Sequence, residues 1–256
     1  MLLLVLVIKA YKTMARAFYS KFESFASVDG PGVRSVLFLT GCPFRCLYCH
    51  NPETWTNNNA KEIEAIDAFK LLTKYKPYWK NNGGVTISGG EPLLQIDFLI
   101  ELFKLLKEKG ISTCIDTAGG PFTKEEPFFS KFNELLKYTD LFLMDIKAPN
   151  SELHKKITGK DNSNVISMFE YLKEKNFPVW IRYVLVPGYT DSQDILNETK
   201  RFIDTLPNVL KVEVLPYHPF ALPKYEELGI PYPLKDTNMP DKESLTLAKE
   251  ILEKRS

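Results

Sequence analysis

Short apolar runs alternate with amphipathic stretches along most of this chain. Apolar runs of this length that end in Gly, Pro or Asp are typical of strands buried on both faces of a sheet. The predicted strands cover 35–40, 85–88, 111–115, 141–144, 179–186 and 211–215, and residues 18–25 lead into the first of them. Apolar residues three and four positions apart predict helices between the strands. The predicted helices cover 61–75, 96–109, 125–138, parts of 151–175, 193–206 and 241–254.

This alternation predicts one α/β domain with a parallel sheet and right-handed crossovers. A closed TIM barrel has eight strand–helix units. The six units found here predict an open, partial (β/α)6 TIM-like barrel with a lateral cleft. We assign residues 18–256 to this domain. Residues 1–17 are interpreted as an N-terminal extension that is either poorly ordered or an artefact of starting the chain at Met1 instead of Met14.

The composition is that of an ordinary globular protein, with 44% hydrophobic and 25% charged residues. The net charge of +1 gives no reason to expect a nucleic acid or a membrane as partner. Residues 1–8 are apolar, but this run is too short to span a bilayer and lacks the basic flank and cleavage site of a signal peptide. Four cysteines in 256 residues do not indicate a disulfide scaffold, so we expect a reduced, cytoplasmic setting.

Three of the four cysteines lie close together directly after the first predicted strand. Cys42, Cys46 and Cys49 have the spacing C-x3-C-x2-C. Iron–sulfur clusters are usually held by four cysteines, so three thiolates would leave one iron of a cubane cluster open for chemistry. A structural zinc site would need a fourth ligand, and His50 directly follows Cys49 and reaches back poorly. The remaining cysteine, Cys114, lies within an apolar strand and is predicted to pack in the core.

Further polar residues and glycines follow the ends of the predicted strands. In a parallel barrel these ends converge at one rim, where active sites lie. The residues at these positions are Cys42, Cys46, Cys49, Gly89, Gly90, Glu91, Asp116, Asp145, Lys147 and His218. Structural roles are the alternatives. Paired glycines often form only a turn, Asp after a strand often caps a helix, Lys is usually solvated, and a histidine after a terminal strand often only forms a hydrogen bond at the edge of the core.

The cysteine motif resembles the cluster loop of the radical S-adenosylmethionine (SAM) superfamily. Flanking motifs narrow the resemblance to the activating enzymes of glycyl radical enzymes, and among them to the branch that acts on pyruvate formate-lyase. These motifs are VDGPG at 28–32, YCHN at 48–51, SGGE at 88–91, WIRYV at 180–184 and LPYH at 215–218. The chain lacks the cysteine-rich insert of several other activators, which agrees with this branch.

The resemblance implies an oxidoreductase, a radical SAM activase, whose 4Fe–4S cluster is held by Cys42, Cys46 and Cys49. Reductive cleavage of SAM would give methionine and a 5′-deoxyadenosyl radical, which removes a hydrogen atom from a glycine Cα of the partner. The implied SAM-binding residues are Tyr48, Cys49, His50, Asn51, Gly90, Glu91, Asp145, Ile146, Lys147 and His218. A monovalent cation is implied at Asp116, Thr117 and Asp145.

The resemblance also implies partners. We expect the turn at Asp29 to contact the partner's glycine loop, a flavodoxin or a ferredoxin to donate electrons, and the chain to be a monomer. Two alternatives stay open. The partner could be another glycyl radical enzyme, such as a diol dehydratase or the anaerobic ribonucleotide reductase. From a different class, the chain could be a zinc-binding module without catalysis.

Overall fold

The computed structural model describes residues 15–79 and 82–254. These residues contain one eight-stranded sheet. The strands are paired in the order β3-β1-β2-β4-β5-β6-β7-β8. Their bounds are β1 Arg16–Ala26, β2 Arg34–Leu39, β3 Lys61–Glu64, β4 Gly84–Gly89, β5 Ser112–Thr117, β6 Leu141–Asp145, β7 Val179–Leu185 and β8 Val209–Pro216. The α-helices are α1 Ala65–Thr73, α2 Ile96–Glu108, α3 Phe128–Leu136, α4 Ser151–Thr158, α5 Ser163–Glu174, α6 Gln193–Asp204, α7 Leu222–Glu227 and α8 Lys242–Leu252.

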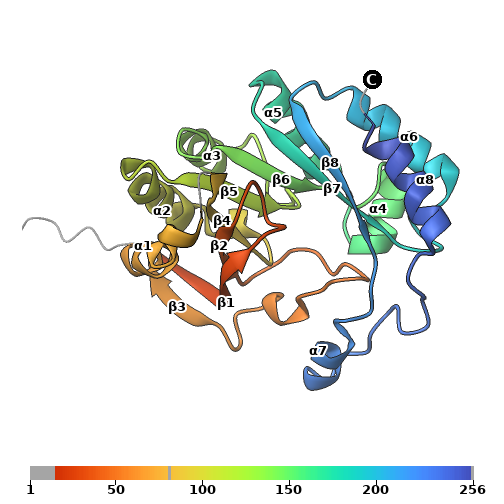
Figure 1. The fold of residues 1–256 in the computed structure, drawn as a ribbon, viewed down its shortest axis with the longest axis horizontal. Coiled ribbons are helices and arrows are strands. Elements are labelled where there is room, and N and C mark those ends of the chain that lie inside the picture. The colour runs from red at the N-terminus through yellow and green to blue at the C-terminus, as the bar shows by residue number, and fades with distance from the viewer. Residues whose placement is uncertain (1–14, 80–81, 255–256) are drawn as a thin grey trace, which may run out of the picture.

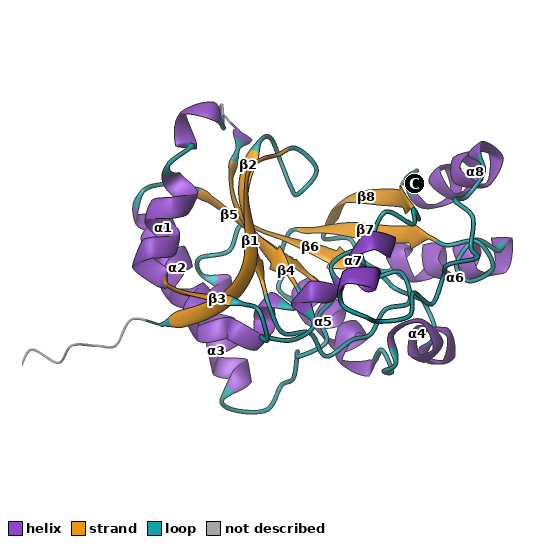
Figure 2. Cartoon of the chain, turned by 90° about the horizontal axis from the view of Figure 1, so that it is seen from below, coloured by secondary structure: helices purple, strands orange, loops and turns teal. Residues whose placement is uncertain are grey.

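Six consecutive strands of this order, from β2 to β8, are parallel to their neighbours. The sheet is strongly curved, and the helices that connect these strands lie along its outer side (Figures 1 and 2). The pairing order ends at β3 and β8, so the sheet of the described residues is an open one. The predicted partial barrel with six parallel strands is confirmed.

Amphipathic helices cover the outer face of the sheet because their apolar residues repeat every three or four positions. In α2, the side chains of Leu99, Leu102, Phe103 and Leu106 are fully buried. Burying a side chain of this size stabilises the fold by about 1.5–3 kcal/mol relative to leaving it exposed. The helices therefore hold the parallel strands in place, and with them the loops at the strand ends.

The antiparallel strands β1 and β3 were not predicted. Residues 61–64 have helical spacing in the sequence, but they form β3, which pairs with β1 and places Glu64 opposite Arg16, with 2.9 Å between the guanidinium and the carboxylate. Pairing with a neighbouring strand here overrides a weak local preference. Residues 16 and 17 belong to β1, and Ala17 is buried, so the boundary that we placed after residue 17 is too late. The rest of the predicted extension, residues 1–14, lies outside the described residues.

The helical region predicted within residues 151–175 forms two helices, α4 and α5. The short helix α7 after β8 was not predicted. Figure 1 shows α7 apart from the other helices, on the open side of the sheet. In the described part of the chain, no helix combines the length and the apolar character needed to cross a membrane.

Candidate active site

The carboxyl ends of the six parallel strands surround a cavity of about 320 Å³. Each of these strands, or the segment directly after it, contributes to the lining. The predicted site residues that line the cavity are Cys42, Cys46, Tyr48, Cys49, His50, Asn51, Gly90, Asp116, Thr117, Asp145, Lys147 and His218. Two predicted residues, Glu91 and Ile146, are buried outside this lining. The strand ends therefore bring together residues that are as far apart in sequence as Cys42 and His218.

The cysteine loop (residues 40–51) has a defined backbone shape. The amide of Gly41 donates to the carbonyl of Thr54 at 2.8 Å, and Gly41 has a φ of +88°. Within the loop, the amide of Cys49 donates to the carbonyl of Cys46 at 3.0 Å. The three thiols of the loop are free and partly buried, and all of them line the cavity. The loop therefore presents three sulfur atoms to one space.

Burial of the loop disfavours its thiolates. It raises the pKa of Cys42 and of Cys46 to about 12, and it also raises the pKa of Cys49. A thiol in such an environment becomes a thiolate when a metal ion binds it and supplies the opposing charge. Within the described residues, no three His, Cys, Asp or Glu side chains are grouped as a site for a single metal ion.

The glycine turn (residues 89–91) packs directly against the base of the cysteine loop. The amides of Gly90 and Glu91 donate to the carbonyls of Leu39 and Gly41, both at 2.8 Å. Gly89 has a φ of +117°, and a Cβ on Gly90 would lie 2.3 Å from the carbonyl oxygen of Gly41. Both glycines are required because two backbones meet here. Gly90 also lines the cavity, so the turn joins the loop to the site.

The carboxyl group of Glu91 is buried beside the cavity and accepts three hydrogen bonds. Its Oε1 accepts hydrogen bonds from Thr117 Oγ1 at 2.5 Å and from the amide of Leu93 at 3.1 Å, and its Oε2 accepts from the amide of Ala118 at 3.1 Å. Burial raises the pKa of Glu91 to about 7, although the hydrogen bond from Thr117 favours the ionised form. The carboxyl group of Glu91 thus connects the glycine turn to the end of β5.

Two carboxylates at the cavity are each paired with a cation of this chain. Asp116 Oδ2 accepts from Ser88 Oγ at 2.7 Å and from Arg182 Nη1 at 3.1 Å, and Asp145 Oδ2 lies 2.7 Å from Lys147 Nζ. Burial raises the pKa of Asp116, Arg182 opposes this shift, and Asp145 adds to it. Burial lowers the pKa of Lys147, but the charge of Asp145 and its hydrogen bond oppose burial, and the pKa of Lys147 lies well above the ordinary value.

For Asp116, Asp145 and Lys147, the alternatives of a helix cap and of a solvated surface lysine are wrong. The residues at the N-caps of the following helices α3 and α4 are Pro127 and Asn150, so neither aspartate caps a helix. The side chain of Lys147 is 13% exposed and forms an ion pair, so it is not a solvated surface lysine. Cys114 is fully buried beside Leu141 and Leu143, which confirms that it packs in the core.

Arg182 lines the cavity but was not among the predicted site residues. Besides Asp116, its guanidinium contacts the β1–β2 turn (residues 28–32), with Nη2 2.6 Å from the carbonyl of Val28 and 3.4 Å from Asp29 Oδ1. The signal in the sequence was a charged residue in the middle of the otherwise apolar strand β7. Strand alternation places Arg182 on the side of the sheet that faces the cavity.

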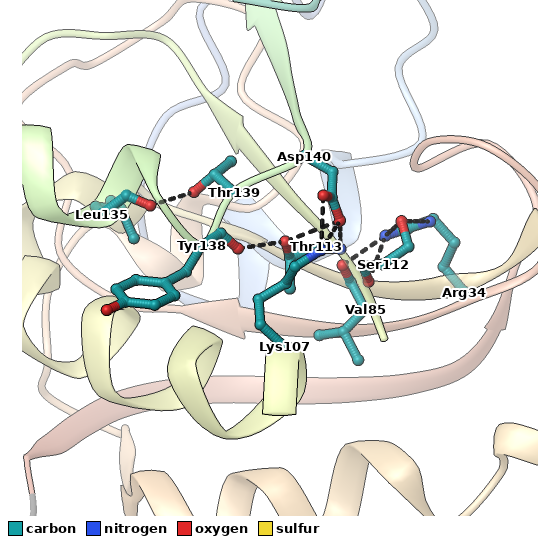
Figure 3. A network of polar contacts seen from close by, with 9 residues as sticks. All are labelled: Arg34, Val85, Lys107, Ser112, Thr113, Leu135, Tyr138, Thr139 and Asp140. Atoms are coloured by element: carbon teal, nitrogen blue, oxygen red, sulfur yellow. Dashed lines mark hydrogen bonds and ion pairs between the residues drawn. The ribbon is translucent and has the colours of Figure 1, made fainter. Parts of the chain in front are cut away.

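A second arginine holds the same turn from the amino end of the sheet. Arg34 is fully buried, and its Nη2 donates to the carbonyls of Val85 at 2.7 Å and Ser112 at 3.1 Å (Figure 3). Its Nη1 donates to the carbonyl of Pro31 at 3.2 Å. The β1–β2 turn is therefore fixed between two arginines, Arg34 at the start of β2 and Arg182 in the middle of β7.

Three buried polar atoms at the cavity have no hydrogen-bond partner among the described residues. They are Tyr48 Oη, Arg182 Nε and His218 Nδ1. The rings of His50 and His218, two of the residues implied to bind SAM, meet edge to face with 4.9 Å between their centroids. Buried polar groups are almost always satisfied in folded proteins, and unsatisfied ones beside a cavity indicate a polar ligand.

Comparison with known proteins agrees with this geometry. Residues 36–199 match the model of the Radical SAM superfamily. A pyruvate formate-lyase-activating enzyme of Listeria monocytogenes is 48% identical over 91% of this chain and 95% of its own length. One of Streptococcus mutans is 47% identical over 90% of this chain and 88% of its own length. The crystal structure of a domain of a pyruvate-formate lyase-activating enzyme from Bacteroides vulgatus has a TM-score of 0.54 at 26% identity, over 66% of this chain and 92% of that domain.

Proposed function

We propose that this chain, which belongs to the radical SAM superfamily and within it to the family of the pyruvate formate-lyase-activating enzymes, is the activase of a pyruvate formate-lyase. The family implies a 4Fe–4S cluster and SAM. When both are bound, the reduced cluster supplies one electron that cleaves SAM to methionine and a 5′-deoxyadenosyl radical, which takes a hydrogen atom from a glycine Cα of the partner. The observation that carries the proposal is that the three thiols of the C-x3-C-x2-C motif line one cavity with the ends of six parallel strands.

The residues present fit these two groups. Cys42, Cys46 and Cys49 would each hold one iron, which leaves the fourth iron for SAM. Three thiols that line one cavity suit an open iron–sulfur cluster, whereas a closed structural zinc site takes four protein ligands. Buried donor and acceptor atoms without partners, Tyr48 Oη and His218 Nδ1, are available to a polar cofactor in the same cavity.

The proposed SAM site uses the residues that the resemblance implied. Those that line the cavity are Tyr48, Cys49, His50, Asn51, Gly90, Asp145, Lys147 and His218. Glu91 and Ile146 do not line the cavity and would instead position residues that do. Glu91 positions Thr117 and the glycine turn, and the amide of Ile146 donates to the carbonyl of Arg182 at 3.0 Å, which fixes the backbone beside Asp145.

We further propose a monovalent cation at Asp116, Thr117 and Asp145 when SAM is bound. The carboxylate of SAM would be the third negative charge in this part of the cavity. Arg182 and Lys147 already neutralise Asp116 and Asp145. A cation between the carboxylates would reduce the repulsion among them, because like charges in a partly buried site repel strongly.

The partner's glycine loop would enter the open side of the barrel and lie against the β1–β2 turn at Asp29. In support, Arg182 connects this turn to Asp116 at the cavity, so the partner and SAM would meet at one residue. A flavodoxin or a ferredoxin would supply the electron, and we propose that the chain acts as a monomer in the cytoplasm.

The first experiment is anaerobic reconstitution of the chain with iron and sulfide, followed by reduction and electron paramagnetic resonance (EPR) with and without SAM. We expect a reduced 4Fe–4S signal that changes when SAM binds. About one zinc per chain and no iron or sulfide would support the zinc module instead. A cluster signal that is unaffected by SAM would contradict the proposed mechanism.

The second experiment identifies the partner. The reduced holoenzyme is mixed with SAM and with purified pyruvate formate-lyase, diol dehydratase or anaerobic ribonucleotide reductase. We expect the glycyl radical signal with pyruvate formate-lyase. A glycyl radical signal only with ribonucleotide reductase, or only with diol dehydratase, would identify that enzyme as the partner instead.

A further inference from the structure

If the chain carries out the proposed function, it must take up one electron for each SAM that it cleaves. Three of its four cysteines are in the cysteine loop, and the fourth, Cys114, is fully buried in the core. The chain therefore has no second set of thiols for a relay cluster. The electron must come from another protein that docks on the surface close to the cysteine loop.

Helix α4 packs against the cysteine loop through backbone hydrogen bonds and one ring contact. The amides of Arg45 and Leu47 donate to the carbonyls of Thr158 and Ile157 at 2.8 and 2.9 Å. In addition, the ring of Phe44 in the loop packs edge to face against that of His154 in α4, at 5.4 Å. No residue of α4 lines the cavity. A protein docked on α4 would thus be next to the loop while the cavity stays free for SAM and the glycine loop.

The exposed side chains at the carboxyl end of α4 and on the loop beside it are basic. We call them the basic patch, which consists of Arg45, Lys155, Lys156 and Lys160. None of the four forms an ion pair with another described residue. This differs from α2 and α3, where Lys104, Lys107, Lys131 and Lys137 all pair with carboxylates.

Acidic residues near the basic patch do not neutralise it. The carboxylate of Asp161 is turned to Ser163, whose amide donates to Asp161 Oδ1 at 3.0 Å and whose hydroxyl donates to the same oxygen. Glu152 lies in the first turn of α4, at the opposite end of the helix. Lysines in the last turn of a helix also favour the helix dipole, but that does not account for Arg45, which is on the loop.

Arg45 is a fixed charge on the loop itself. Its Nη1 donates to the carbonyls of Cys42 and Phe44, both at 2.8 Å. Its guanidinium lies 5.0 Å from the ring centroid of Trp55. The surface next to the cluster ligands is therefore positively charged and held in a defined position.

We infer that the basic patch is the docking surface of an acidic electron-carrier protein, a flavodoxin, which delivers its electron through the cysteine loop. Complementary charge raises the rate of encounter and orients the two proteins. Docking on α4 leaves the cavity accessible, so the donor and the glycyl radical enzyme occupy different faces of the chain.

The test is the affinity of the reconstituted holoenzyme for flavodoxin, measured by anaerobic calorimetry at low salt and at 0.2 M salt. The variant is K155E/K156E/K160E, which leaves Arg45 in place because it contacts the cysteine loop. The matched control is K61E/K74E/K109E, which changes the net charge equally. Its lysines are exposed, form no ion pair with another described residue, and lie on or directly after β3, α1 and α2, at the other end of the sheet from α4 (Figure 1).

We expect Kd for flavodoxin to rise about tenfold or more at low salt in the patch variant, because electrostatic steering contributes about 10- to 1,000-fold to association. The control should change it by about twofold or less, and 0.2 M salt should reduce the difference. SAM cleavage driven by dithionite, and the EPR response to SAM, should be the same in all three proteins.

The outcomes separate docking from the proposed function. A wild-type chain that holds no cluster, or that cleaves no SAM with dithionite, would contradict the proposed function whatever the patch does. Normal cleavage with dithionite, but equal loss of flavodoxin affinity in both variants, would overturn the docking surface alone. Loss of binding to the glycyl radical enzyme with intact flavodoxin binding would assign the patch to that partner. Binding of ferredoxin through the patch, with none of flavodoxin, would overturn the choice of carrier.

Discussion

Arg34 and Arg182 hold the same turn, but the environments of the two side chains differ. Arg34 donates to the carbonyls of Pro31, Val85 and Ser112, and burial lowers its pKa. Burial also acts against the charge of Arg182, but the carboxylates around it, with Asp116 contributing most, raise its pKa overall. Nε of Arg182 has no partner among the described residues, whereas Nε of Arg34 donates to Thr86 Oγ1 at 2.7 Å.

The polar groups around the two arginines differ in the same way, since those near Arg34 have hydrogen-bond partners and some near Arg182 do not. Near Arg34, Asp140 bonds Lys107 at 2.7 Å and accepts from the amide of Thr113 at 2.9 Å (Figure 3). At the cavity, Tyr48 and His218 keep buried polar atoms without partners among the described residues. A satisfied network stabilises a fold, whereas unsatisfied groups are available to a ligand. In a parallel barrel the amino end therefore serves stability and the carboxyl end serves chemistry.

The largest expected effect comes from the cysteine loop. Cys42→Ser removes one of the three proposed cluster ligands, so we expect the reconstituted variant to lose the SAM-dependent EPR signal and all SAM cleavage. The control is Cys114→Ala in the core, which should retain both and lose about 1 kcal/mol of unfolding free energy. Iron content, EPR and product analysis are the measurements. Retention of a SAM-responsive cluster in Cys42→Ser would show that another group replaces this ligand.

Arg182→Gln should mainly impair function. It leaves Asp116 without its cation and releases the β1–β2 turn. We expect KM for the partner to rise, and the rate of glycyl radical formation to fall about 100-fold, the loss that misplacement by about 1 Å can cause. Kinetics of radical formation, together with the affinity for SAM, are the measurements. Equal kinetics for Arg182→Gln and wild type would mean that the turn does not contact the partner.

Arg34→Met should mainly reduce stability and leave function intact, in contrast to Arg182→Gln. Three carbonyl groups lose their donor, and each buried unsatisfied group costs about 1–3 kcal/mol. We therefore expect a loss of about 3–5 kcal/mol in the free energy of unfolding, with the affinity of the remaining folded protein for SAM unchanged. Urea denaturation and SAM titration are the measurements. A large loss of SAM affinity at unchanged stability would contradict the purely structural role of Arg34.

The smallest expected effect concerns the pH dependence at Glu91. Its pKa is raised in the folded chain to about 7, so its contribution to stability is present below the unfolded pKa of about 4.5 and is lost as the pH rises through 7. The difference is about 3 kcal/mol at 1.36 kcal/mol per pKa unit. In the cluster-free chain, Glu91→Gln should therefore show a smaller fall in unfolding free energy between pH 5 and pH 8 than wild type. Parallel curves for the two proteins would rule out Glu91 as the titrating group.

The parts of the fold that repeat were predictable from the pattern of the chain. The six parallel strands are predictable because strands buried on both faces are continuous apolar runs, as in 141–144. The antiparallel strands β1 and β3 were not, because many of their residues are partly exposed, which weakens the apolar pattern, and only β3 is the edge strand on this side of the sheet. Edge strands depend on the strand that they pair with more than on their own residues.

The site was predictable where several chemical groups are adjacent in sequence. The C-x3-C-x2-C motif is local, so it indicates a cluster without any knowledge of the fold. Residues at strand ends were also predictable, because parallel strands bring their carboxyl ends to one rim. Arg182 was missed as a site residue because its partners Asp29 and Asp116 are 153 and 66 residues away in sequence.

The sequence alone thus specified the fold class, the proposed cluster ligands and the set of polar residues at one rim, all of which follow from local periodicity and spacing. The folded chain specified which of those residues are paired and which are not. Asp116 is paired with Arg182, Asp145 with Lys147, and Glu91 faces the protein and not the cavity. The physical reason is that burial, hydrogen bonding and charge pairing depend on distances between segments, and a linear pattern contains no such distances.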